Sequence, residues 1–394
     1  MKSSLFFTFL IFTGLLSAFP FVDFVGGVQQ NDTLSKDANK ASDGLLAIAT
    51  VELGKFGFIN TRGEWVIEPI YDNVGQFSEG LAYVHNDSIS AFINTEGQIV
   101  IDNVTKMVNS PFFYNGLAAC ESDEEQAFMI NRKGKKIIQS FNYLGNLSHG
   151  LIPAQFFFDS SDPGPFMSFD NAKSGYITPK GRWAIETNLL NTPRDFHEGL
   201  VVIQLANDKF GALNTKGDTI IEPEYILLSD FHSGVACACS PDRTCQFIDK
   251  TGKTITDEKF FSFTEFSDGH AFAVTQDEKL KVIDSTGTTI FVSDKLYERI
   301  TTFSGGVASF IDDSTSGFLN LSLSVIFEMP EADGVLMGNF INGYAFYLKD
   351  GKIGIMNDEF EKVVNPRFLL CGDFLDPEAS NAYQHLYYEG EFTP

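Results

Sequence analysis

One stretch of about 35 residues recurs along nearly the whole of this 394-residue chain, and this repeat constrains the fold more than any other feature. The clearest copy, GKFGFINTRGEWVIEPIYDNVGQFSEGLAYV, begins at Gly54, and further copies begin at Lys209 and Cys245. A period of roughly 20–50 residues is typical of an array of small supersecondary units. Because such units contact mainly their neighbours, the length of the chain does not by itself predict separate domains.

Each unit opens on a short apolar strand introduced by a glycine. Nine such glycines recur along the chain: Gly44, Gly80, Gly116, Gly150, Gly199, Gly234, Gly269, Gly306 and Gly343. A second strand then runs into a tight turn such as Asn60-Thr61-Arg62-Gly63. The Asn side chain can accept a hydrogen bond from the backbone two residues on, and the glycine supplies a positive φ. Apolar residues on both sides of this turn predict a β-hairpin.

The return strand of each unit ends in an aromatic anchor. Pro69 and Pro223 mark the end or the edge of a strand, since proline cannot donate to a ladder. An aromatic residue lies three residues before the next glycine: Phe77, Phe113, Phe196, Phe231, Phe266, Phe303 and Phe340, with Leu147 once in that place. Burying one Phe contributes about 1.5–3 kcal/mol, whereas ordering the backbone costs about 1–2 kcal/mol per residue. No unit should therefore fold alone, and a shared aromatic seam is the predicted core.

These residues resemble the WG repeat family. Its motif runs aromatic-Gly-aromatic-Ile-Asp, then Ile-x-Pro-x-Tyr, then Phe-x-x-Gly-Leu-Ala. The runs Phe56-Gly57-Phe58-Ile59-Asn60 and Phe210-Gly211-Ala212-Leu213-Asn214 match it with Phe in place of the naming Trp, and the resemblance extends over residues 44–370. It implies a β-repeat fold used for binding or cell-envelope interaction, with no enzyme activity assigned.

The repeat predicts an all-β fold. We expect a tandem array of about nine three-stranded antiparallel β-meander repeats over residues 44–370, open and β-solenoid-like. The alternative is a closed β-propeller, which usually has about 4–8 blades of four strands. An open array must protect its ends from strand pairing. Residues 371–394 are therefore expected to form a C-terminal tail or cap.

The N-terminus predicts export. Lys2 precedes an apolar run from Leu5 to about Val22, so residues 1–27 are expected to be a signal peptide or an N-terminal anchor. Residues 28–43 are polar and are expected to form a linker. The predicted location is extracellular, periplasmic or associated with the cell envelope.

The net charge of −24 excludes some partners. Nucleic-acid binding requires clustered Lys and Arg, and the phosphate backbone would repel this surface. An anionic membrane surface is disfavoured for the same reason, so membrane contact is expected only through the N-terminal anchor. The same charge also keeps a protein soluble.

No motif of known chemistry occurs in the sequence. It lacks a glycine-rich phosphate loop, a zinc-protease helix, a nucleophile elbow and a calcium loop. We therefore predict no catalytic, cofactor-binding or metal residues. The predicted function is an exported, non-catalytic binding or scaffold module for a protein or cell-envelope glycan partner. The alternatives are an enzyme with a site between repeats and a purely structural spacer.

Histidines and cysteines leave two questions open. Four histidines lie within two residues of the recurring glycine: His149, His197, His232 and His270. They either meet in neighbouring turns, where a metal or an acidic group would bind, or are ordinary polar turn residues. Of the five cysteines, Cys237, Cys239 and Cys245 form either a metal cluster or a buried group with a local disulfide to Cys245.

Two acidic runs remain, residues 121–125 and residues 159–170. The second lies in the long insertion, where the spacing from Gly150 to Gly199 is 49 residues. Insertions in repeat proteins gather on binding faces. Gln155 to Ala172 is therefore the predicted contact surface.

Overall fold

The computed structural model describes residues 47–52, 54–107, 110–122, 127–157, 172–187, 193–204 and 208–372. Within these ranges the protein is all-β, and its one helical element is a short 3₁₀ turn, η2 (Glu331–Asp333). The fold class predicted from the repeat is thus confirmed. The expected signal segment, the polar linker and residues 373–394 of the tail lie outside the described residues.

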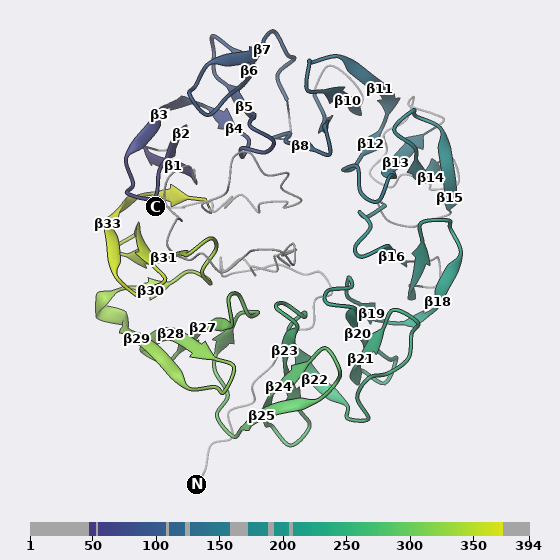
Figure 1. Cartoon of the computed structure of the whole chain (residues 1–394), viewed down its shortest axis with the longest axis vertical. Coiled ribbons are helices and arrows are strands. Elements are labelled where there is room, and N and C mark those ends of the chain that lie inside the picture. The colour runs from purple at the N-terminus through teal and green to yellow at the C-terminus, as the bar shows by residue number, and fades with distance from the viewer. Residues whose placement is uncertain are drawn as a thin grey trace.

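The sheets stand around a central axis as the blades of a ring (Figure 1). In the described residues the strands form eight hydrogen-bonded antiparallel sheets. The seven-stranded sheet spans two repeat units, which are joined by the pairing of Cys245 with Phe260. The ring therefore has nine blades, one for each predicted unit.

The first five blades follow the chain from the N-terminus. Blade 1 is built from β34 (Leu370–Cys371), β1 (Ala47–Glu52), β2 (Lys55–Ile59) and β3 (Trp65–Tyr71). Blade 2 contains β4 (Asn73–Val74), β5 (Ala82–His85), β6 (Ser90–Ile93) and β7 (Ile99–Ile101). Blade 3 contains β8 (Phe113–Tyr114), β9 (Leu117–Cys120), β10 (Ala127–Asn131) and β11 (Lys136–Phe141). Blade 4 contains β12 (Tyr143–Leu144), β13 (Ile152–Phe157), β14 (Ala172–Ile177) and β15 (Trp183–Thr187), and blade 5 contains β16 (Leu200–Gln204), β17 (Phe210–Asn214) and β18 (Thr219–Tyr225).

The last four blades complete the ring. Blade 6 contains β19 (Leu227–Leu228), β20 (Val235–Cys239) and β21 (Cys245–Asp249). Blade 7 contains β22 (Phe260–Phe263), β23 (His270–Thr275), β24 (Leu280–Asp284) and β25 (Thr289–Ser293). Blade 8 contains β26 (Arg299–Ile300), β27 (Val307–Asp312), β28 (Thr315–Asn320) and β29 (Val325–Pro330), and blade 9 contains β30 (Val335–Leu336), β31 (Tyr344–Lys349), β32 (Lys352–Asn357) and β33 (Lys362–Phe368).

The two ends of the array pair with each other. In blade 1, Ala49 pairs with Cys371 and Thr50 with Leu370, and Leu369 N donates to Thr50 O at 2.8 Å. This closure corrects the expectation of an open, solenoid-like array in favour of the propeller alternative. It also moves the end of the array beyond residue 370, because Cys371 belongs to β34 and not to a tail or cap. Pairing removes the exposed sheet edges that an open array would have to protect.

Most blades have a strand that the sequence pattern did not predict. It is a short inner strand, often of two residues, ahead of the longer ones, as β4 is in blade 2 and β30 in blade 9. A two-residue strand has no alternation of apolar and polar residues to recognise. The predicted three-stranded meander is present in the described part of every blade except blade 6, which has two longer strands, and the inner strand extends the sheet toward the axis (Figure 1).

The hairpin turns form as their residues predict. Asn60 Oδ1 accepts hydrogen bonds from the backbone N–H groups of Arg62 and Glu64, both at 3.0 Å. Gly63 closes the turn with a φ of 73°, a conformation that is costly for residues with a Cβ. The same bonds recur at Asn94, Asn131, Asn214, Asp249, Asp284 and Asn320.

The glycine of the aromatic-Gly signature allows a close backbone approach. A Cβ on Gly57 would overlap the carbonyl oxygen of Ile67, and one on Gly211 would overlap that of Ile221. In blade 1 the register of β2 with β3 shifts between Phe56 and Phe58, so the two backbones draw together at this point. Only a residue without a side chain fits there.

The predicted aromatic anchors are all buried and form the seams between blades. Six of the seven anchors pack on a ring from the preceding blade, with centroid distances of 4.7 Å for Phe58–Phe77 and 4.5 Å for Phe318–Phe340. Phe231 packs in an apolar cluster with Ala212. Hydrogen bonds also join adjacent blades. Between blades 4 and 5, Ser148 Oγ donates to Phe196 O at 2.7 Å. The Phe residues therefore act as shared core between units, as predicted.

Candidate functional site

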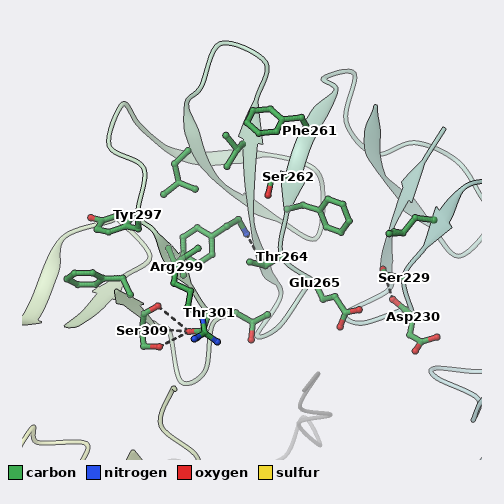
Figure 2. Close-up of a pocket in the computed structure, with 18 of the residues that line it drawn as sticks. Ser229, Asp230, Phe261, Ser262, Thr264, Glu265, Tyr297, Arg299, Thr301 and Ser309 are labelled. Atoms are coloured by element: carbon green, nitrogen blue, oxygen red, sulfur yellow. Dashed lines mark hydrogen bonds between the residues drawn. The ribbon is translucent and has the colours of Figure 1, made fainter. Parts of the chain in front are cut away.

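A cavity of about 1030 Å³ lies along the inner strands of blades 6 to 9 (Figure 2). Its wall is formed by residues 227–230, 261–265, 296–302 and 336–338, together with Arg194 and side chains of the strands behind them. We call this space the arc cavity. It is as large as the sites that hold drug-sized ligands, which measure about 300–1,000 Å³.

The arc cavity coincides with a local departure from the repeat. The position just before the anchor aromatic is acidic in blades 5, 6 and 7, where it is Asp195, Asp230 and Glu265. The position just after the anchor is His197 in blade 5 and His232 in blade 6, whereas blades 2, 4, 7 and 8 have serine there. The residue types thus change together on neighbouring blades.

At the position before the anchor, the side chain reaches back to the preceding blade. Asn339 Oδ1 accepts the backbone N–H of Ser309 at 2.6 Å. Asp195 accepts two hydrogen bonds from Asn146, from N at 3.2 Å and from Nδ2 at 3.1 Å. In these two blades the position therefore ties adjacent blades together.

Asp230 and Glu265 make looser contacts at the equivalent place. His197 Nε2 lies 3.8 Å from Asp230 Oδ2, and His232 Nε2 lies 3.8 Å from Glu265 Oε2. Arg194 Nη1 lies 3.5 Å from Asp230 Oδ1, an ion-pair distance, but this buried oxygen accepts no hydrogen bond. Separations near 3.8 Å exceed those of hydrogen bonds. Both carboxylates therefore line the arc cavity without close donors.

Burial makes ionisation of Asp195 and Glu265 costly. It raises the pKa of Asp195 from 3.8 to about 6, and the hydrogen bonds from Asn146 only partly offset this effect. Burial also raises the pKa of Glu265, which the nearby His232 partly lowers again. Carboxylates held in low-dielectric surroundings without full compensation are typical of functional sites.

The opposite end of the arc cavity is apolar. Leu227 in β19, Phe261 in β22 and Leu296, just before β26, are 36%, 39% and 39% exposed. Figure 2 shows Phe261 far from Asp230 and Glu265, with the other wall residues between them. The arc cavity thus has one polar, acidic end and one apolar end.

Hydroxyl groups hold the wall between the two ends in place. Ser229, Thr264 and Thr301 occupy the same position in blades 6, 7 and 8. Their Oγ atoms accept backbone N–H groups of the adjacent strands, with distances of 2.9, 3.0 and 2.9 Å. Because these bonds fix each inner strand to its neighbour, the wall is preformed.

The structure brings together two of the four predicted histidines. The rings of His197 and His232 have centroids 5.5 Å apart, each beside an acid of the next blade. His149 instead bonds Ser148, and His270 bonds the carbonyl of Asp268. Within the described residues, no three histidine and carboxylate ligand atoms lie within 4.8 Å of one another.

The cysteine question is answered by a disulfide. Cys239 and Cys245, paired across β20 and β21, are bonded to each other. Cys237 is a free, buried thiol within 4.8 Å of both sulfurs. The local disulfide to Cys245 was the non-metal alternative, and the described structure contains it.

Sequence reasoning named no residue of the arc cavity wall as a site. Asp230, Glu265 and Arg194 belong to no known sequence motif. Only an alignment of the repeat units with one another could have identified the acidic positions. Most of the predicted contact surface, residues 155–172, lies outside the described residues. Acidic residues 123–125 lie wholly outside them. Among the described residues, no helix has the length and apolar character needed to cross a bilayer.

The described residues define a closed, nine-bladed β-repeat ring with the arc cavity along its inner strands. Comparison with protein families supports the β-repeat class. The family model described as "WG containing repeat" matches residues 56–88 and residues 210–239. The chain therefore carries WG repeats in these two segments, and the resemblance noted in its sequence is confirmed there. No curated protein matches the sequence.

Comparison with solved structures finds similar chains at low sequence identity. A crystal structure of the eukaryotic initiation factor aligns with a TM-score of 0.55 and 8% identity, over 86% of this chain and 100% of that one. The computationally designed Ika8 protein aligns with a TM-score of 0.42 and 13% identity, over 71% of this chain and 94% of that one. BamB from Moraxella catarrhalis gives a TM-score of 0.36 and 14% identity, over 77% and 92%. The first of these likenesses supports the overall fold and carries no functional information.

Proposed function

We propose that this chain is an exported, non-catalytic β-repeat protein that binds a segment of a partner protein in the arc cavity. The observation that carries the proposal is the coincidence of two features on one arc of the ring. The arc cavity lies where the side chains depart from the structural pattern of the other blades. In a repeat protein, positions that abandon a shared structural role are candidates for function.

The form of the arc cavity supports a macromolecular segment as its occupant. Its volume of about 1030 Å³ accommodates several residues of an extended chain. Exposed apolar side chains at Leu227, Phe261 and Leu296 offer contact area, and hydrogen-bonding groups stand beside them. A preformed pocket of this mixed character is the usual form of a binding site.

Export rests on the sequence of residues 1–27, with a positive residue ahead of an apolar run. Its test is direct. The protein from its native cells should be found outside the cytoplasm by fractionation, and N-terminal sequencing of it should begin near residue 28 if the segment is cleaved. Recovery of the chain in the cytoplasm would contradict export.

Binding in the arc cavity is tested by site-specific photocrosslinking in the native cells. A benzoylphenylalanine at Leu296, exposed on the cavity wall, should form a covalent adduct with a discrete partner. The same probe at Thr289, exposed on the outer strand β25, is the matched control. Ser262→Trp should obstruct the arc cavity and abolish capture by the probe at Leu296. Equal adducts from both positions, or capture that survives Ser262→Trp, would refute the proposal.

A further inference from the structure

We propose that the bound segment is a basic peptide, and that a lysine or arginine side chain of it is seated between Asp230 and Glu265. This inference rests on the proposed function and specifies the chemistry of the occupant. It follows from the charges around the acidic end of the arc cavity, from their spacing, and from the groups that flank them.

The acidic end has fewer cations than carboxylates. Asp230 and Glu265 occupy equivalent positions on successive blades and both line the cavity, and Arg194 lies 3.5 Å from Asp230. The histidines beside Asp230 and Glu265 stand 3.8 Å away, too far for a hydrogen bond. A buried carboxylate is stabilised by a cation that also donates hydrogen bonds. A further cation in the arc cavity would therefore stabilise these carboxylates.

The spacing favours an organic cation over a metal ion. Ligand atoms stand about 2.1 Å from a transition metal, so three of them must lie close together. No three His, Asp or Glu ligand atoms among the described residues are within 4.8 Å of one another. An ammonium or guanidinium nitrogen lies about 2.8 Å from each carboxylate oxygen it contacts. Such a group donates through separate N–H bonds and does not require three ligand atoms close to one another.

The remaining wall suits the rest of a peptide. Arg299 and the hydroxyl of Ser262 also line the arc cavity and are donors for backbone carbonyl groups. Phe261 and Leu227 offer an apolar surface to neighbouring side chains. Figure 2 shows Arg299 on the side of Thr301 and Ser309, apart from the acidic pair. The net charge of −24 adds long-range attraction for a basic partner.

The test is selection of peptides by the full-length protein. A random heptapeptide library is panned on the wild-type chain and, in parallel, on Ser262→Trp. We expect enriched peptides that contain Lys or Arg and that fail to bind Ser262→Trp. For the best peptide, replacement of its lysine by norleucine, which keeps the methylene chain and removes the ammonium, should weaken binding at least tenfold by calorimetry.

Matched variants locate the cation. Asp230→Asn and Glu265→Gln should each reduce the preference for lysine over norleucine about tenfold, whereas Glu222→Gln, on the exposed outer strand β18, should leave it unchanged. Selected peptides that require the cavity and yet show no preference for basic residues would refute the seat for a cationic side chain. A preference for lysine that survives in both variants would refute it as well. Either result would leave the proposed function intact. Peptides that bind Ser262→Trp equally well, or no enrichment at all, would overturn both and direct attention to a glycan.

Discussion

Asp195 offers the sharpest test of the energetics of this ring. Its carboxylate lies between blades 4 and 5 and accepts two hydrogen bonds from Asn146. In Asp195→Asn, the backbone N–H of Asn146 keeps an acceptor, and rotation of the Asn146 amide restores the second bond with the donor reversed. The substitution therefore removes the charge and preserves the contact.

The pH dependence follows from the raised pKa of Asp195, which burial moves from 3.8 to about 6. Between these values the folded protein holds a proton that the unfolded chain has released. The contribution of Asp195 to stability is therefore full below pH 3.8 and is lost as the pH rises through 6. One pKa unit is worth about 1.4 kcal/mol, so the loss is at most about 3 kcal/mol. The variant has no carboxyl group here and should lack this loss.

The measurement is urea denaturation of the full-length wild type and Asp195→Asn at pH 4, 5, 6, 7 and 8. The free energy of unfolding of the variant minus that of the wild type should grow by about 2–3 kcal/mol from pH 4 to pH 7. Asp218→Asn, on an exposed hairpin turn, is the control and should show no such trend. A difference that is constant with pH, or one that shrinks as the pH rises, would refute the argument.

Three further outcomes are expected. Gly57→Ala should lower the free energy of unfolding by about 1–3 kcal/mol in the same denaturation assay, because the added Cβ would overlap the Ile67 carbonyl. Gly338→Ala is the control and should be neutral, because nothing lies close to the added Cβ. Deletion of residues 369–394 should lower the denaturation midpoint below that of a chain lacking only residues 373–394, because it also removes β34; equal midpoints would argue against closure as a source of stability. Burial raises the pKa of the Cys237 thiol well above its usual range, so mass spectrometry should find it unalkylated by iodoacetamide until urea unfolds the chain; rapid labelling of the native protein would contradict this.

Much of each blade was predictable because its determinants are local. Asn60 and Gly63 make a hairpin turn through bonds within five residues, and the anchor aromatics recur at a fixed distance from the next glycine. Pro69 indicated an edge, and β3 is indeed the outermost strand of its sheet. In each case the physical cause lies within the unit that shows the pattern.

The inner strands and the arc cavity were not predictable in the same way. β19 consists of two residues and leaves no periodic signal. Asp230 and Glu265 resemble ordinary turn residues until the fold places each beside a histidine of the preceding blade. The repeat pattern assigns such positions a common role, whereas burial and the neighbouring blade decide what each one does.

By itself, the sequence determined the number of units, their antiparallel hairpins and the aromatic seam that stacks them, because these depend on contacts within a unit or between adjacent units. Only the tertiary structure decided whether the array remains open. Thr50 and Leu370 pair across 320 residues of sequence, and that meeting depends on the small rotation accumulated from blade to blade. The same rotation places Asp230 and Glu265, from two successive blades, beside one cavity, so the candidate site is a property of the closed ring and of no single repeat.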